Sequence, residues 1–455
     1  MGGFNHELQN VVQTGVAFFF VLFAFNCSAF IEQTVISSAA EKGGISEHAG
    51  YRSLAIIYFF FFAGNFIAVP IIEHTSAKWS MTVGGLCYAT FQVGFLFLNE
   101  YYLYISSAVL GFGAAILWTG QGKYLTSIST GENSRRNSGI LWAIFQGSIS
   151  SGGVFLLGIF TFISTGPTIT EETVLTLYSV FAVVNIVGVI VMAFLRNPVQ
   201  TKSTENHSIK QTLTSTFSLM VTKKMLLLAF AFGFTGFETT MWSGVYPTVI
   251  SFTTQLGSNT KALLATYAIN SGIGQILGGC IFGILGEKTK RFGRHNIVLC
   301  GMILHLITFA LIFVNFPAEA SLRSTSELGW IEPSIVIAMV CGFLLGLCDS
   351  IWNTQLYAFL VDNYKTQSSQ AFALFKSYQA LCACIAFFYS SFFDLTCHLI
   401  VLAVVAVLGA VGFYWCEMII GNERKNSSDT EETITVTKSY TFAVDLCAHD
   451  TQPSV

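Results

Sequence analysis

Long apolar segments recur along almost the whole chain, and they constrain its fold more than any other feature of the sequence. A helix needs about 20 mostly apolar residues to cross the hydrocarbon core of a bilayer. Twelve segments meet this length, at 11–36, 51–73, 80–98, 101–125, 139–165, 174–195, 224–253, 261–286, 297–316, 334–361, 370–393 and 396–420. We therefore expect an all-α integral membrane protein with twelve transmembrane helices and the lipid bilayer as its main partner.

The composition supports a membrane protein and excludes several other classes. Only 10% of the 455 residues are charged and 53% are hydrophobic, whereas soluble domains carry about 25% charged residues. A net charge of −3 argues against a nucleic-acid partner. Most of the 11 cysteines lie in apolar segments, which is typical of neither a disulfide framework nor a zinc site.

The distribution of Lys and Arg predicts the orientation, because positively charged loops stay in the cytoplasm. Sixteen of the 22 basic residues fall on the face that the twelve spans assign to both termini. Four fall on the opposite face, and Lys123 and Lys376 lie inside spans. Both termini are therefore expected in the cytoplasm, in either the plasma membrane or an internal membrane.

Loop lengths divide the chain into two halves. The longest connection between spans is polar and rich in Thr and Ser. We expect an N-terminal six-helix bundle over 1–195, a cytoplasmic linker over 196–223 and a C-terminal six-helix bundle over 224–420. The tail over 421–455 is rich in Ser, Thr, Asp and Glu, so we expect it to be disordered.

Similar residues recur in the two halves in the same order, which indicates a duplication. Four sets match at offsets between 206 and 234: Glu32 and Thr34 with Glu238 and Thr240, Leu54 and Gly64 with Leu264 and Gly274, Trp118 and Gln121 with Trp352 and Gln355, and Trp142 and Gln146 with Phe375 and Gln379. Two parallel six-helix pseudo-repeats are the plan of the major facilitator superfamily fold.

Short motifs strengthen this resemblance and narrow it to one family. The loop between the eighth and ninth spans contains Glu287, Arg291, Gly293 and Arg294, which resemble the superfamily's gating-loop signature. The corresponding loop after the second span, near Glu73, has lost most of this signature. The segments LWTGQGKYLT (117–126), RNSGILWAIFQ (136–146) and LLGLCDSIWNTQ (344–355) resemble the Unc-ninety-three-like family of that superfamily.

The resemblance implies two different functions. The family is named for a regulator of a potassium channel, and another member escorts nucleic-acid-sensing receptors out of the endoplasmic reticulum. Other members are regarded as transporters. One hypothesis is a secondary transporter that moves an organic solute, with or without a proton, by alternating access. The alternative is a non-transporting regulator or trafficking partner of an ion channel or receptor.

Glu238 is the strongest candidate for a substrate-cavity or proton-coupling residue. It lies about 20 Å along its predicted helix, near the middle of the membrane. Trp242 and Tyr246 follow at i+4 and i+8, and an acid beside aromatic rings suits a cation or a coupled proton. The alternative is a protonated Glu238 bonded to a neighbouring helix, with the two rings as interfacial anchors.

Asp349 and Lys376 are the next candidates, because ionisable residues inside a membrane are costly. Asp349 lies midway along its span with Asn353 one turn on, whereas Lys376 lies only about 9 Å from the cytoplasmic end of its own span. A direct pair between them is therefore unfavourable, and a snorkelling or structural role for Lys376 is preferred.

The remaining candidates are Glu32, the indole of Trp118 and the side-chain amides of three glutamines in the predicted spans. Glu32 lies near the outer end of the first span and could reach headgroup water. If helices one, four, seven and ten face a central cavity, as in the superfamily, Gln121, Glu238 and Asp349 surround it. Trp118, Gln146 and Gln355 either belong to this cavity or pack helices together. The Gly274, Gly278 and Gly279 spacing predicts close helix packing.

Nothing in the sequence favours an enzyme, a metal site or a cofactor. Gly120-Gln-Gly122-Lys123 lacks the first glycine and the final Ser or Thr of a phosphate-binding loop. Cys382 and Cys384 point to different faces of a helix, so they cannot share a metal ion.

Overall fold

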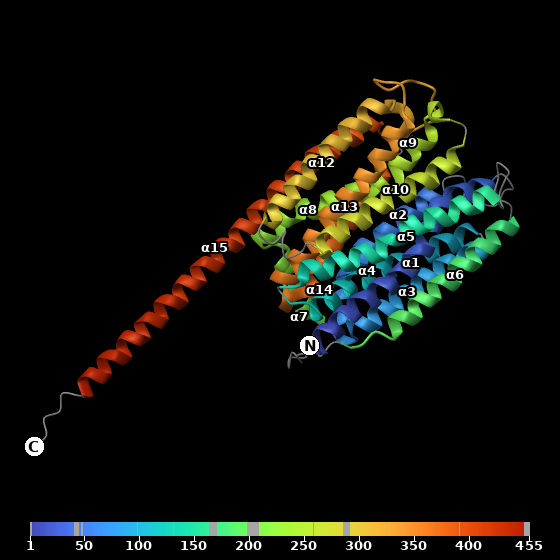
Figure 1. The fold of residues 1–455 in the computed structure, drawn as a ribbon. Helices are drawn as coiled ribbons and strands as arrows, with labels where there is room; N and C mark the ends of the chain where they lie inside the picture. Colours follow the sequence, from blue (N-terminus) through green and yellow to red (C-terminus); the bar gives the residue numbers. More distant parts are fainter. Residues whose placement is uncertain are drawn as a thin grey trace, which may run out of the picture.

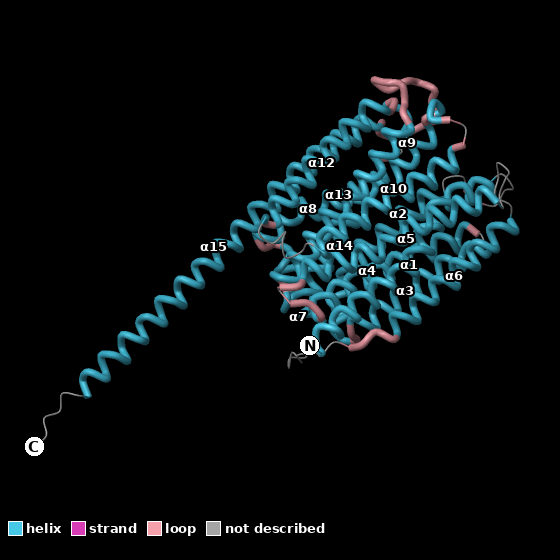
Figure 2. Tube along the Cα trace, viewed as in Figure 1, coloured by secondary structure: helices cyan, strands magenta, loops and turns pink. Residues whose placement is uncertain are grey.

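The described part of the chain is almost entirely helical. The computed structural model describes residues 2–40, 45–46, 49–97, 99–130, 132–162, 171–197, 209–257, 259–284, 292–390 and 392–449. Helices account for nearly all of these residues (Figure 2). The β-bridge between Thr253 and Thr325 is isolated and belongs to no strand among these residues.

The N-terminal half consists of six long helices that pack side by side (Figure 1). They are α1 (Gly2–Ala40), α2 (Ala49–His74), α3 (Ala77–Gly94), α4 (Glu100–Ser127), α5 (Ser134–Phe162) and α6 (Glu171–Ala193). Polar side chains start two of them: Ser76 accepts a hydrogen bond from the amide of Trp79, and Asn99 accepts from Tyr101 and Tyr102.

The C-terminal half repeats this arrangement, with one interrupted helix. α8 (Lys223–Thr240) continues through a π-helical turn (Met241–Val245) into α9 (Tyr246–Phe252), so these three elements form one span. The other helices are α10 (Thr260–Ile284), α12 (Arg294–Asn315), α13 (Ile335–Asn363), α14 (Ser368–Tyr389) and α15 (Leu395–His449).

Eleven helices in the described residues are long and apolar enough to cross a membrane. The twelfth expected span is α10, which is 25 residues long but carries Asn270, Ser271 and Gln275 among its glycines. α10 packs between α5 and α13. With α10, the helices form two sets of six, as the apolar segments predict.

Two pairs of helices join the halves. The most extensive contact between them lies between α5 and α10, and the second lies between α2 and α14. These pairs occupy equivalent positions in the two pseudo-repeats. We call them the α5–α10 seam and the α2–α14 seam.

The expected linker contains a helix of its own. α7 (Ile209–Met220) packs on α2 and α14, close to where the two halves meet. Its Phe217 ring stacks on Phe66 at 5.4 Å, and Gln370 donates a hydrogen bond to Ser215. Residues 198–208 lie outside the described part of the chain.

Both chain ends lie at the same end of the bundle, which we call the terminal end, and the opposite one is the far end (Figure 1). The expectation of a disordered tail differs from the structure, because α15 continues as a helix to His449 and projects beyond the bundle. The segment from 422 to 449 contains neither Gly nor Pro, so nothing in it breaks the helix that starts at Leu395.

Candidate functional site

The most polar part of the membrane interior is a cluster of three ionisable side chains in the C-terminal half. Glu238 comes from α8, His305 from α12 and Asp349 from α13, and all three are buried. His305 Nε2 lies 3.3 Å from Glu238 Oε1. Asn353, one turn along α13, donates a hydrogen bond to Asp349 Oδ1 at 2.8 Å. We call these four residues the acidic cluster.

The two carboxyl groups of the acidic cluster interact directly. Oε2 of Glu238 and Oδ2 of Asp349 receive no hydrogen bond from any other residue that the structure describes. Two buried carboxylates with so few donors repel each other, whereas one proton between them allows a hydrogen bond. A single proton shared by the two carboxyl groups would remove this repulsion.

This geometry changes the predicted role of Glu238 and its neighbours. Glu238 and Asp349 meet inside the C-terminal bundle. The expected arrangement of Gln121, Glu238 and Asp349 around a central cavity stays a prediction. Tyr246 is fully buried and donates to the Ala338 carbonyl at 2.7 Å, so it is not an interfacial anchor. Trp242 is half-buried, and its carbonyl accepts a hydrogen bond from Tyr267.

Lys376 does not snorkel, which corrects the preferred interpretation. Its side chain is 3% exposed, and Nζ donates to Gln379 Oε1 at 2.8 Å. The ammonium lies 4.8 Å from the Trp118 ring centroid, 4.6 Å from Phe375 and 5.3 Å from Tyr357. The predicted absence of a direct pair with Asp349 agrees with these contacts, because the ammonium uses an amide and ring faces instead.

A second polar group closes the α5–α10 seam. Gln275 of α10 accepts hydrogen bonds from the Trp142 indole and the Gln146 amide of α5. Glycines let the two backbones approach, because a Cβ on Gly279 would lie 2.6 Å from the Ala143 nitrogen. Gln146 therefore packs helices, as one of its two predicted roles requires.

The remaining glycines confirm the predicted close packing. Gly274 and Gly278 face α13, where added Cβ atoms would lie within 3 Å of Leu347 and Ser350. α10 therefore uses one glycine face for its own half and another for the partner half.

The N-terminal half contains a simpler polar cluster at the position equivalent to Glu238. Glu32 is 4% exposed and accepts a hydrogen bond from Ser53, so it does not reach headgroup water. Ser53 in turn lies 3.0 Å from the Ser107 hydroxyl. No second carboxyl group or histidine contacts Glu32 among the described residues.

Gln121 and Gln355 occupy equivalent positions on α4 and α13 and share an unusual environment. Both are fully buried, and neither their amide nitrogen nor their carbonyl oxygen has a hydrogen-bond partner in the described structure. Trp118, one turn from Gln121, donates to the Tyr88 hydroxyl at 3.2 Å. Burying an amide without a hydrogen-bond partner costs free energy, and it leaves a donor and an acceptor that no described residue uses.

Ion pairs cross the terminal end of the bundle. Glu73, at the end of α2, pairs with Lys123 of α4 at 2.6 Å and accepts a hydrogen bond from Ser369 of α14 at 2.6 Å. Glu73 thereby joins the two halves even though its loop departs from the superfamily signature. Ser369 is the residue that couples the pair to the C-terminal half.

The predicted gating loop is only partly described. Glu287 and Arg291 lie outside the described residues. Gly293 has φ +82°, a conformation that favours glycine, and it directly precedes α12. Arg294 is buried and pairs with Asp362 at the end of α13. This part of the loop fastens two helices of the C-terminal half.

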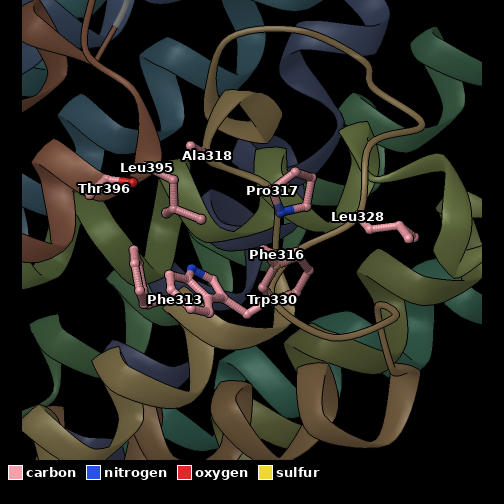
Figure 3. Close-up of a pocket in the computed structure, with 9 residues that line it drawn as sticks. Phe313, Phe316, Pro317, Ala318, Leu328, Trp330, Leu395 and Thr396 are labelled. Atoms are coloured by element: carbon pink, nitrogen blue, oxygen red, sulfur yellow. The ribbon is translucent and has the colours of Figure 1, made fainter.

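A surface cavity of about 420 Å³ lies at the far end, between the end of α12, the loop that follows it and the start of α15 (Figure 3). Phe313, Phe316, Leu328, Trp330 and Leu395 line it, together with Pro317, Ala318, Gly329 and Thr396. Its lining side chains are apolar apart from Thr396, and none of them is a candidate residue. We assign no chemistry to it. The described residues also contain no group of His, Cys, Asp or Glu that is arranged to hold a metal ion.

Sequence reasoning missed His305, Gln275, Gln379 and the Glu73 partner Lys123. His305 had a usable signal, because a lone histidine eleven residues into an apolar helix is costly in lipid. Gln275 and Gln379 resemble ordinary helix-packing amides. Gln275 bonds to α5 and Gln379 donates to Thr235 of α8, and both of these helices are far away in the sequence, so no local pattern identifies these contacts.

Comparisons with known proteins agree with this architecture. The family described as "Ion channel regulatory protein UNC-93" matches residues 41–414. UNC93-like protein MFSD11 of Xenopus laevis is 34% identical over 436 residues, which cover 91% of this chain and 96% of the relative. Protein unc-93 homolog A of Bos taurus is 26% identical, with 90% of this chain and 93% of the relative covered.

Solved structures show the same fold. A major facilitator superfamily transporter, FucP, in the outward conformation superposes with a TM-score of 0.65 at 12% identity, covering 90% of this chain and 99% of FucP. At this identity the likeness concerns the fold alone. Neither this fold nor the matched family is that of an enzyme. The chain is therefore a multi-pass membrane protein that belongs to the UNC-93 family and has the major facilitator superfamily fold.

Proposed function

We propose that this protein is a secondary transporter that moves an organic solute by alternating access and couples the movement to a proton. The observation that carries the proposal is the direct contact between two fully buried carboxyl groups, Glu238 and Asp349. A proton that binds there removes a charge from the membrane interior, and such a change can bias a transporter between two conformations.

His305 and Asn353 complete the proposed coupling site. His305 can exchange a proton with Glu238 across the 3.3 Å contact, and Asn353 holds the Asp349 carboxyl in place. The three ionisable groups come from α8, α12 and α13, so movement of any one helix changes their separation. Protonation and helix packing are therefore linked within the C-terminal half.

The contacts between the halves support a rocking motion. The two seams lie between helix pairs at equivalent positions, and the Glu73–Ser369 contact joins the halves at the terminal end. Opening this end requires that contact to break. We assign the terminal end to the cytoplasm because sixteen of the 22 basic residues lie on that face. A C-terminal epitope tag should be inaccessible in sealed cells, and surface labelling of the tag would contradict this orientation.

A non-transporting regulator or trafficking partner of an ion channel or receptor is the second candidate. Its support is the description of the matched family as ion channel regulatory. Such a protein would keep the acidic cluster as a structural hydrogen-bonded group. It would need partner contacts on loop or lipid-facing residues.

Uptake by proteoliposomes of the purified full-length chain separates the two candidates. The panel should contain radiolabelled organic anions, organic cations, sugars and amino acids, each tested with an acidic and a neutral external solution. We expect uptake of at least one class, with a rate that depends on the external pH. Absence of uptake for every class under both conditions, in liposomes that contain folded protein, would favour the regulator.

A further inference from the structure

Lys376 is a buried cation that lacks a counter-ion in contact. Its only hydrogen-bond partner is Gln379, and no carboxylate lies within 4 Å of Nζ among the residues that the structure describes. An ammonium has three N–H donors, so two of them make no hydrogen bond. Asp349 acts on Lys376 only at longer range, and its carboxyl group contacts Glu238 and Asn353 instead.

The walls around this ammonium come from both halves of the protein. Tyr357 and Phe375 belong to α13 and α14, whereas Trp118 belongs to α4. Trp118 is held in place by its bond to Tyr88 and by edge contacts with Phe18 at 5.4 Å. The Lys376 pocket, defined by Lys376, Gln379 and these three rings, therefore spans the boundary between the halves.

Separation of the halves would uncover the ammonium. Trp118 would leave with the N-terminal half, while Tyr357, Phe375 and Gln379 would stay with Lys376. Once it is exposed to water, the amine would carry a positive charge and two unused donors, flanked by flat apolar surfaces. A carboxylate satisfies such donors with charge-assisted hydrogen bonds, and an aromatic or other flat apolar body can stack on the rings.

From this arrangement we infer that the Lys376 pocket binds the carboxylate of an organic anion whose apolar body lies against Trp118 and Tyr357. The inference rests on the proposed transport function, because it names the class of solute that would be carried. It also predicts binding that can be measured without any transport. An organic cation is disfavoured, because Lys376 already places a positive charge inside the aromatic pocket.

The test uses matched ligands and the purified full-length protein in detergent. The probes are benzoate, phenylacetate and an aliphatic hydroxy acid, with benzamide as the neutral match and benzylammonium as the cationic match. Binding is measured as a concentration-dependent rise in unfolding temperature. We expect at least one carboxylate to stabilise the protein, and neither benzamide nor benzylammonium to do so.

Variants then connect the binding to Lys376. Lys376→Gln should weaken carboxylate binding by about tenfold to a hundredfold, the usual effect of losing a hydrogen bond to a charged group. Lys376→Arg should keep part of the affinity for the carboxylate. If Lys376→Gln does not fold, Lys376→Arg still tests whether binding depends on this position. Lys224→Gln is the matched control, because Lys224 is a solvent-accessible lysine that pairs with Glu423 at the terminal end.

Three results would overturn the inference: no stabilisation by any carboxylate, equal stabilisation by benzoate and benzamide, or stabilisation of the wild-type protein by benzylammonium that equals or exceeds the stabilisation by benzoate. These outcomes are distinct from failure of the transport proposal. Carboxylate binding that depends on Lys376 without any uptake would refute transport and keep the anion site. Uptake of a cation or a sugar without carboxylate binding would keep transport and refute the anion site.

Discussion

The α5–α10 seam and the α2–α14 seam occupy equivalent positions but are built differently. In the first, backbones approach closely and Gln275 joins Trp142 to Gln146. In the second, Tyr58 packs on Phe387 at 5.3 Å, the Ser377 hydroxyl donates to the Phe62 carbonyl, and Gln379, the counterpart of Gln146, accepts a hydrogen bond from Lys376. The duplicated residue thus holds the halves together at one seam and serves a buried cation at the other.

This difference assigns separate mechanical roles to the two seams. Backbone contact along α5 and α10 leaves little room for sliding, so we regard this seam as the pivot. Side-chain contacts can break and re-form more easily. We therefore expect the α2–α14 seam, which adjoins the Lys376 pocket, to be the one that opens.

The largest expected effect comes from adding bulk to the pivot. Gly279→Val places a branched side chain against the Ala143 backbone, 2.6 Å from its nitrogen, and no flexible side chain can move aside. We expect a loss of about 3 kcal/mol of stability, at the upper end for overpacking. Gly158→Val is the control on α5, because a Cβ there meets nothing within 4 Å. Equal abundance and unfolding temperature for the two variants would contradict close packing at this seam.

A smaller effect is expected when the polar clamp of the pivot is removed. Gln275→Leu deletes the acceptor of the Trp142 and Gln146 hydrogen bonds, and interhelical hydrogen bonds in membranes contribute about 0.6 kcal/mol each on average. The expected loss is therefore about 1 kcal/mol, read as a lower unfolding temperature. A double-mutant cycle with Gln146→Leu should show coupling, and strictly additive losses would show that the two amides act independently.

The smallest effect on stability is expected at the terminal end of the opposite seam. Glu73→Gln breaks a partly exposed pair with Lys123, and such pairs contribute about 0.2–1 kcal/mol. The halves should nevertheless separate more readily there, because Ser369 loses its charged partner. The accessibility of a cysteine at the neighbouring buried position, Ser368→Cys, should rise in the Glu73→Gln background. Unchanged labelling would show that Glu73 does not hold this end closed.

Much of the fold was predictable because it depends on local properties of the sequence. Apolar length identifies the spans, and the offset between Trp118 and Trp352 reveals the repeat. α10 (Thr260–Ile284) lies close to the expected span over 261–286, because that segment is long and mostly apolar. The tail was harder to predict. Its composition predicted disorder, but the segment lacks any residue that ends a helix, and α15 continues through it to His449.

The candidate site was only half predictable, because its contacts cross between helices. Insertion cost alone identified Glu238, Asp349 and Lys376 as unusual. Which of them meet depends on the rotation of each helix, and a single sequence does not contain that rotation. The depths of the two residues along their helices correctly predicted that Asp349 and Lys376 make no direct pair. They also led to the wrong prediction that the Lys376 side chain snorkels to water, because nothing local indicates that Trp118 covers it.

The most direct test of the central claim is the pH dependence of uptake in proteoliposomes that contain Glu238→Gln. Gln mimics the protonated carboxyl group and can still bond to His305, so the variant should fold and reach the wild-type amount of protein per liposome. Wild-type uptake should increase when the external solution is made acidic. The account predicts that Glu238→Gln removes this dependence. Uptake by Glu238→Gln that responds to pH as the wild type does would exclude Glu238 from proton coupling.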